Sequence, residues 1–172
     1  MIKKGIILAG GLGTRLSPLT KPISKQLLPI YDKPLIFYPL SVLMLCNIRD
    51  VLIIVKKGEK ENFKKVFGNG NDLGIKINYK EQLNPKGIPD AFIVGENFIK
   101  NSNIALILGD NFFYGQGLSE ILRKSFSLKN GACIFTYPIN NPENFGIVEK
   151  IRGSKKLKII EKPKKTKSNR AI

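Results

Sequence analysis

Short runs rich in isoleucine, valine and leucine alternate with helix-like segments through most of the chain. The apolar runs lie at residues 5–9, 50–55, 75–80 and 103–108. Their composition predicts parallel strands that are buried on both faces. Amphipathic or apolar segments predict helices at residues 34–46, 60–67 and 118–126. Because strand–helix–strand crossovers are right-handed, this alternation predicts an α/β fold: a Rossmann-like, doubly wound, mostly parallel sheet with helices on both faces.

The sequence also predicts a buried helix, a strand-rich C-terminal region and the bounds of the domain. The segment at residues 34–46 is apolar almost all round, which predicts a buried helix with Pro34 in its first turn. Beyond residue 131 the chain is rich in strand-like runs, and residues 145–151 and 157–163 predict antiparallel strands. Without an internal repeat or a linker, we expect one domain over residues 1–172, ending in a basic, flexible tail at residues 163–172.

The net charge of +16 is concentrated at the C-terminal end. From Lys150 onward there are ten basic residues and one acidic residue, a net of +9. The closing segment EKPKKTKSNRAI has no aromatic residues on which bases could stack. We therefore expect a solvated tail, and no nucleic-acid partner.

The sequence also limits where the protein can be located and which state its cysteines can have. No uninterrupted apolar run reaches about 18 residues, and the N-terminus lacks the apolar segment of a signal peptide. We expect a cytoplasmic protein with no membrane partner. Cys46 and Cys133 lie in apolar runs without the paired spacing of a zinc site, which predicts buried, reduced thiols.

A glycine-rich segment, LAGGLGTRL at residues 8–16, directly follows the first apolar run. A P-loop ends in Gly-Lys-Ser/Thr, so the sequence Gly13-Thr14-Arg15 excludes one. A dinucleotide-binding loop needs a third glycine and a later acidic residue, so Gly11 and Gly13 fit only its first half. The segment favours a loop whose N–H groups approach phosphate oxygens beside the fixed cation of Arg15. A turn with an exposed arginine is the alternative.

Asp110 follows the fourth apolar run, in LILGDNFFYG, and should lie where a strand gives way to a loop. A carboxylate there can hold a magnesium ion that bridges phosphates, or it can cap a turn or helix. The chain contains no histidine, which removes the commonest general base. Attack by an anionic phosphate oxygen on a nucleoside triphosphate needs no proton abstraction, so this is the reaction class that the residues favour.

Longer segments resemble a known family. These are GIILAGGLGTRLSPLTKPISKQLLPIYDKPLIFYPLSVLML, YKEQLNPKGIPDAF, LILGDNFFYG, NPENFGIVE and EKPKKTKSN. In order, and over essentially all 172 residues, the chain resembles the sugar-phosphate nucleotidylyltransferases, and SKQLLPIYDKP resembles their thymidylyl branch. The resemblance implies that dTTP and glucose 1-phosphate, its partners, react to dTDP-glucose and pyrophosphate with Mg²⁺ as the cofactor.

The resemblance also implies roles for individual residues. The nucleotide-binding residues would be Leu8, Gly10, Gly11, Gly13, Thr14, Arg15, Gln26, Gln82 and Gly87. The sugar-phosphate-binding residues would be Lys25, Gly146, Glu161 and Lys162. The catalytic residues would be Arg15, which neutralises the triphosphate, Lys25, which lies between the phosphates of the two substrates, and Asp110, the metal ligand. Gln82 would read the thymine edge, because an amide offers both a donor and an acceptor, and Gly87 would lie against the base. Without the resemblance, Lys25 is a surface charge and Glu161-Lys162 a charged strand end.

This chain differs from the family at three positions and in its length. Pro89 and Asp90 stand where the family usually has a small residue and glutamine, and Arg170 stands where it usually has tyrosine. Family members are longer, and the additional part carries a second metal-binding aspartate, more of the sugar pocket and much of the interface of a homo-oligomer. The chain therefore has an alternative interpretation as a truncated, inactive remnant that at most binds nucleotide.

Overall fold

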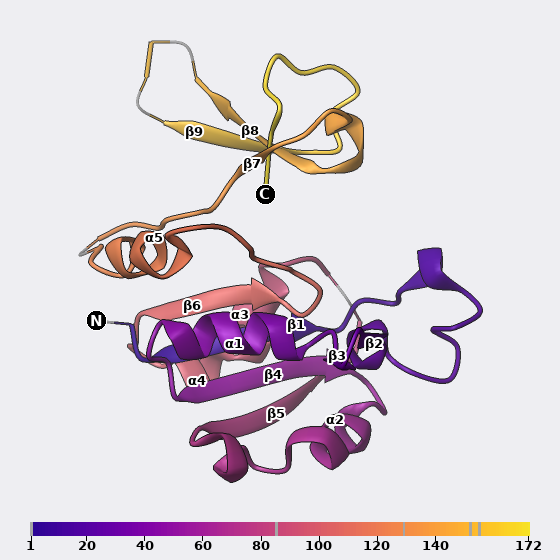
Figure 1. The fold of residues 1–172 in the computed structure, drawn as a ribbon. Coiled ribbons are helices and arrows are strands. Elements are labelled where there is room, and N and C mark those ends of the chain that lie inside the picture. Colours follow the sequence, from indigo (N-terminus) through magenta and orange to yellow (C-terminus); the bar gives the residue numbers. More distant parts are fainter. Residues whose placement is uncertain (1, 85, 129, 152, 155) are drawn as a thin grey trace. The chain divides into compact units, whose positions relative to one another are not determined.

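The computed structural model describes residues 2–84, 86–128, 130–151, 153–154 and 156–172 (Figure 1). The chain divides into two units, Met1–Ser127 and Leu128–Ile172, and each is described by itself. No helix in the described ranges is long and apolar enough to cross a membrane.

A parallel sheet forms the centre of the first unit (Figure 1). In the described part of the chain it has four strands in the order β5-β4-β1-β6. These are β1 (Lys4–Ala9), β4 (Asp50–Lys56), β5 (Lys76–Gln82) and β6 (Ile104–Leu108). The chain runs outward from β1 through β4 to β5, then crosses back to pair β6 with the other edge of β1. The carboxyl end of β1 is therefore the switch point of the sheet, where ligands bind in folds of this kind.

Helices cover both faces of this sheet. Helix α1 (Phe37–Leu45) packs closely on β1, since a Cβ on Gly5 would come within 2.7 Å of Leu43 Cδ1. On the other face, a core cluster joins Ile6, Leu52 and Ile54 of the strands to Ala91. Ala91 belongs to α3 (Asp90–Val94), and α4 (Glu96–Ile99) follows it. The remaining helices of this unit are α2 (Lys60–Phe67) and α5 (Leu118–Ser125). The predicted α/β fold is confirmed, with its parallel strands where the apolar runs lie.

Two local predictions were wrong. Pro34 does not enter a helix: it pairs with Pro29 in a hairpin formed by β2 (Pro29–Ile30) and β3 (Lys33–Pro34), so that α1 begins only at Phe37. Cys46 is buried as expected, but Cys133 is exposed. The apolar run around Cys133 yields only a short strand, β7 (Tyr137–Pro138), whose two residues are both exposed. Cys133 itself lies outside this strand.

The second unit contains an antiparallel sheet in the order β7-β10-β8-β9. Its longer strands, β8 (Gly146–Lys150) and β9 (Leu157–Glu161), confirm the antiparallel pair that the sequence predicts. The last strand, β10 (Arg170–Ala171), pairs with both β8 and β7, and Ala171 is fully buried. The expected tail at residues 163–172 is therefore tied into this sheet near its end, because the backbone of β10 completes the ladder.

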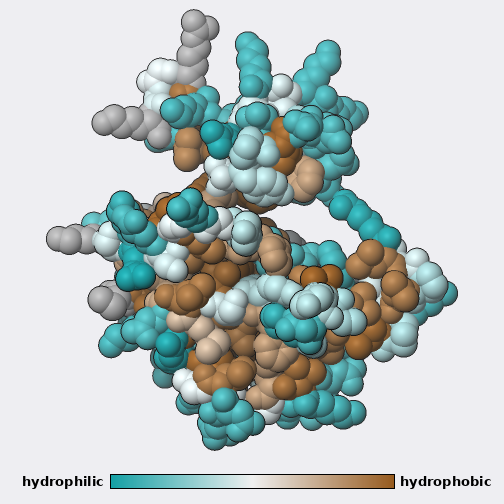
Figure 2. Space-filling view, viewed as in Figure 1, coloured by the Kyte–Doolittle hydropathy of each residue, from teal (hydrophilic) through white to brown (hydrophobic). Residues whose placement is uncertain are grey.

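The loop between β1 and β2 exposes apolar side chains. Figure 2 shows hydrophobic side chains on this loop, and Leu12, Leu16 and Leu19 are 57%, 40% and 62% exposed. These leucines are not part of the core. Substitutions of these three leucines should therefore spare the fold.

Candidate active site

The parallel strands deliver several of the predicted site residues to one edge of the first unit. Gly10 and Gly11 follow β1, Gln82 ends β5, and Gly109 and Asp110 follow β6. The N–H of Gly109 donates to the carbonyl of Leu8 at 2.9 Å, which ties the loop after β6 to the end of β1. Since all four strands are parallel, their carboxyl ends meet at this edge.

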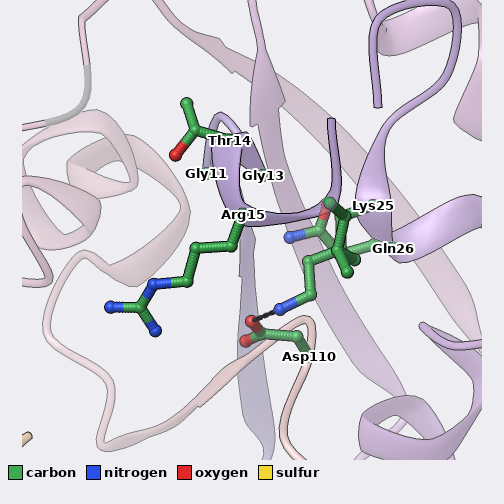
Figure 3. Close-up of a pocket in the computed structure, with 8 residues that line it drawn as sticks. Gly11, Gly13, Thr14, Arg15, Lys25, Gln26 and Asp110 are labelled. Carbon is green, nitrogen blue, oxygen red and sulfur yellow. Dashed lines mark hydrogen bonds and ion pairs between the residues drawn. The ribbon is translucent and has the colours of Figure 1, made fainter. Parts of the chain in front are cut away.

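A cavity of about 210 Å³ opens at this edge (Figure 3). It is lined by Gly11, Gly13, Thr14, Arg15, Leu16, Lys25, Gln26 and Asp110. All of these except Leu16 are among the predicted site residues. Leu16 belongs to the same short 3₁₀ turn as Arg15 (Thr14–Leu16), so its place beside the predicted cation was the only signal for it in the sequence.

Lys25 and Asp110 form an ion pair across this cavity. Lys25 Nζ lies 2.8 Å from Asp110 Oδ2, and the two side chains are 32% and 34% exposed (Figure 3). They come from different segments of the chain, since Lys25 begins a 3₁₀ turn (Lys25–Leu27) and Asp110 follows β6. The carboxylate of Asp110 thus contacts a side chain 85 positions away, which does not fit the alternative of a local turn or helix cap.

Arg15 provides a second cation at the cavity. Figure 3 shows its side chain extending past the Lys25–Asp110 pair, with the guanidinium apart from both. Within the described ranges no ion pair involves Arg15. A guanidinium in this position is available to a ligand with several anionic oxygens, which its planar fork can contact at two points.

The glycine loop has a backbone conformation that needs glycine at Gly13. Gly13 adopts φ 64°, and a Cβ there would come within 2.9 Å of Thr20 Cγ2. Thr20 in turn donates its hydroxyl to the carbonyl of Gly13 at 2.8 Å. Thr20 therefore supports the loop, a role that its position seven residues further along the chain did not reveal.

Gln26 is a buried polar residue behind the cavity. It is 3% exposed, and its Oε1 accepts a hydrogen bond from the hydroxyl of Ser24 at 2.7 Å. A Cβ on Gly109 would lie 2.9 Å from Gln26 Cγ, so the absence of a side chain at Gly109 lets Gln26 reach the end of β6. Gln26 thus joins the segment that carries Lys25 to the loop that carries Asp110.

Gln82 lies beside the start of the glycine loop. It is 3% exposed, and its Nε2 donates to Asp90 Oδ2 at 2.5 Å. Its Oε1 faces Gly10, where a Cβ would come within 2.5 Å of that oxygen. Gly87 adopts φ 94°, so glycine is favoured there by the backbone itself, while a Cβ would meet only Pro89 Cδ at 3.7 Å.

Three of the four residues predicted to bind the sugar phosphate lie together in the second unit. Gly146 begins β8 and pairs with Glu161 at the end of β9, and the N–H of Lys162 donates to the carbonyl of Phe145 at 3.0 Å. A Cβ on Gly146 would approach Glu161 Oε2 to 3.2 Å. The Lys162 Nζ and Glu161 Oε1 atoms are 4.0 Å apart, and both side chains are exposed. Lys25, which shares this predicted role, belongs to the first unit.

Asp110 has no cluster of other candidate metal ligands around it among the described residues. Among the described residues, no group of three or more histidine, cysteine, aspartate or glutamate side chains could hold a metal ion. Mg²⁺ is commonly held by one or two carboxylates, with substrate phosphates and water supplying the other oxygen ligands. A lone aspartate beside a glycine-rich loop fits that mode of binding, and does not fit a dedicated protein cage.

Comparison with known proteins gives matches along the whole chain. Residues 4–172 match the nucleotidyl transferase family. A glucose-1-phosphate thymidylyltransferase of Neisseria meningitidis is 52% identical over 169 residues, which are 98% of this chain and 59% of that protein. An enzyme of the same name from Mycolicibacterium smegmatis is 47% identical over 169 residues, 98% of this chain and 58% of that protein. The chain thus spans less than two thirds of the length of these relatives.

Solved structures support the same relationship. A Bacillus anthracis protein assigned as a glucose-1-phosphate thymidylyltransferase, in complex with a sucrose, superposes with a TM-score of 0.89 at 36% identity, covering 98% of this chain and 68% of that one. A UDP-glucose pyrophosphorylase of Acinetobacter baumannii gives a TM-score of 0.84 at 21% identity, covering 100% of this chain and 72% of that one. The second likeness concerns the fold alone.

Proposed function

This chain belongs to the nucleotidyl transferase family, and we propose that it condenses dTTP with glucose 1-phosphate to form dTDP-glucose and pyrophosphate. The observation that carries the proposal is the cavity at the switch point of the sheet, where Lys25 pairs with the carboxylate of Asp110 and Arg15 supplies a second cation. The names of the similar proteins from Neisseria and Mycolicibacterium support the choice of substrates.

The proposed reaction needs positioning and charge neutralisation more than proton transfer. A phosphate oxygen of glucose 1-phosphate attacks the α-phosphorus of dTTP, the bond from that phosphorus to the β-phosphate oxygen breaks, and pyrophosphate leaves. The nucleophile arrives ionised, so no general base is required. This agrees with a sequence that contains no histidine.

The residues of the first unit divide this work. In the proposal, the N–H groups from Gly10 to Thr14 hold the triphosphate, and Arg15 neutralises charge on the leaving pyrophosphate. Lys25 contacts the phosphates of both substrates, and its ammonium can follow the oxygens during the transfer because it is a compact charge on a flexible chain. Leu8, Gln26, Gln82 and Gly87 complete the proposed nucleotide site.

Asp110 is the proposed ligand of Mg²⁺. When bound, the ion would neutralise charge on the triphosphate and orient it. The ion would compete with Lys25 for the charge of this carboxylate, and the phosphates of the nucleotide would provide Lys25 with another partner. In the second unit, we assign the glucose 1-phosphate contacts to Gly146, Glu161 and Lys162, where the carboxylate can accept from sugar hydroxyls and the ammonium can face the phosphate.

Pyrophosphate release by the purified chain tests this proposal. The assay contains dTTP, Mg²⁺ and glucose 1-phosphate, and each is omitted in turn. Release that requires all three supports the reaction. A folded chain that binds dTTP without releasing pyrophosphate would limit the function to nucleotide binding, and a chain that does neither would refute the proposal.

Two variants connect the activity to the cavity. Arg15→Ala should lower turnover by about 10³-fold or more, as for other cations that stabilise phosphoryl transfer. Asp110→Asn should shift the Mg²⁺ dependence of turnover to higher concentration. Lys65→Ala removes an exposed charge of α2 and serves as the control. Turnover in Arg15→Ala equal to that of the control would remove Arg15 from the mechanism, and an unchanged Mg²⁺ titration in Asp110→Asn would remove Asp110 from metal binding.

A further inference from the structure

Asp90 contacts the side chain that we propose to read the nucleotide base. Gln82 ends β5 and Asp90 begins α3, and the hydrogen bond runs from Gln82 Nε2 to Asp90 Oδ2. The other end of the amide, Oε1, faces Gly10 at the start of the glycine loop. The nitrogen and the oxygen of this buried amide therefore have different surroundings.

The chemistry of these surroundings permits one orientation of the amide. A carboxylate only accepts hydrogen bonds, whereas an amide has a nitrogen that donates and an oxygen that accepts. Reversing the Gln82 amide would turn Oε1 toward the Asp90 carboxylate, so that two acceptors would face each other and a charge-assisted hydrogen bond would be lost. At 3% exposure, Gln82 has little access to water that could compensate.

We propose that Asp90 is a positioning residue that holds the Gln82 amide in one orientation and so selects thymine and uracil over cytosine. The inference rests on the proposed function, in which Gln82 faces the base. Thymine and uracil have an N3–H donor beside the O4 acceptor. The fixed Oε1 can accept from N3–H, while the second hydrogen of Nε2 donates to O4. Cytosine has an acceptor at N3 beside an amino donor, a pattern that only the reversed amide matches.

An acidic residue at this position acts on the amide differently from an amide side chain. Glutamine or asparagine can either donate or accept, so such a residue would satisfy the Gln82 amide in both orientations. Aspartate removes that freedom. The selection arises from the charge at residue 90, although residue 90 itself does not touch the base.

Binding of matched nucleotides tests the inference. The purified chain is titrated calorimetrically with dTTP, dUTP and dCTP in the presence of Mg²⁺, since these share one sugar and differ only in the base. The test variant is Asp90→Asn, which keeps the size of the side chain and lets it donate. Asp72→Asn, which removes the same charge from an exposed turn, is the control. Asp90→Glu keeps an acceptor-only group.

The expected result is specific to one pair of ligands. In the parent chain dTTP should bind about 100-fold or more tightly than dCTP, and Asp90→Asn should reduce that ratio by about 10- to 100-fold. The ratio of dTTP to dUTP should stay unchanged, because both bases carry N3–H and O4. Asp90→Glu and Asp72→Asn should both retain the parent discrimination against dCTP.

Several outcomes would overturn the inference. These are an unchanged ratio of dTTP to dCTP in Asp90→Asn, or an equal weakening of all three nucleotides, which would indicate a merely structural role. If circular dichroism shows that Asp90→Asn does not fold, Asp90→Ser replaces it, because serine can also donate and is favourable where a helix starts. A folded parent chain that binds none of the nucleotides would refute the proposed function and this inference together. If the parent chain binds dTTP but the ratio in Asp90→Asn is unchanged, only the inference about Asp90 is refuted.

Discussion

Replacing Gly10 by alanine tests how closely the glycine loop and the proposed base-reading residue are packed. The added Cβ would lie 2.5 Å from Gln82 Oε1, so this oxygen must retreat by about 1 Å to reach an ordinary van der Waals distance. The amide cannot retreat freely, because its nitrogen is held by Asp90. Gly10→Ala should therefore break or distort that hydrogen bond.

The magnitude follows from a comparison with the neighbouring glycine. A hydrogen bond to a charged group contributes about 1.5–3 kcal/mol to stability. Replacing glycine by alanine also stabilises the folded state by about 0.4–1 kcal/mol through the unfolded chain. Gly11→Ala carries only this second effect, since nothing lies within 4 Å of its added Cβ and its φ is not positive. Gly10→Ala should thus be less stable than Gly11→Ala by about 1.5–3 kcal/mol.

Urea unfolding followed by far-ultraviolet circular dichroism measures this difference, because the chain has no tryptophan for fluorescence. In a thermal scan the two variants should differ by about 3–12 °C for a chain of this size. A second substitution, Gln82→Ala, removes the obstructing amide, so Gly10→Ala should cost less stability in that background. Equal unfolding free energies for Gly10→Ala and Gly11→Ala would refute the contact.

Two further perturbations concern charge. Lys25→Met frees the Asp110 carboxylate, so Mn²⁺ used as a probe in the absence of nucleotide should bind up to about fivefold more tightly, a small effect because the pair is partly exposed. Lys33→Met, which breaks the Lys33–Asp32 pair instead, should leave Mn²⁺ binding as it was, and tighter binding in both variants would contradict a specific role for Lys25. Burial raises the pKa of Tyr79 to about 12, so the stability contributed by its protonated phenol is complete below pH 10 and is lost as the pH rises toward 12. At pH 8 Tyr79→Phe should cost about 0.5–1.5 kcal/mol, since the phenol donates to the carbonyl of Gly68 at 2.8 Å. Urea midpoints of parent and variant should converge between pH 10 and 12, and a constant difference over that range would contradict the raised pKa.

The central sheet could be predicted from the sequence because its strands are buried on both faces. Such strands need apolar residues at nearly every position, which leaves a continuous signal such as that of β4 (Asp50–Lys56). The short helices α3 and α4 gave no comparable signal, since four or five residues are too few for a helical period to be recognised. Pro34 was assigned to a helix because its pairing with Pro29 depends on the hairpin turn and not on its own residue type.

The candidate site was predictable where a residue type has few alternative uses. Consecutive glycines followed by arginine, and an aspartate at a strand end, indicate phosphate chemistry, and the structure gathers Gly11, Arg15 and Asp110 around one cavity. Residues that act through another residue left no such signal. A threonine in a loop can have many uses, and the support that Thr20 gives to Gly13 appears only when the loop is folded.

The two carboxylates at this edge differ in what a ligand requires of them. The Lys25 ammonium is paired with Asp110, so a metal ion at that carboxylate would compete with Lys25, which can move to another anion. A nucleotide triphosphate supplies such an anion, so metal and nucleotide binding should strengthen each other by the same factor. The Gln82 amide nitrogen has two hydrogens, so Asp90 can keep its hydrogen bond while the other hydrogen contacts a base. Asp110 is therefore suited to an exchange of partners during binding, whereas Asp90 is suited to remain in place and set the direction of Gln82 throughout.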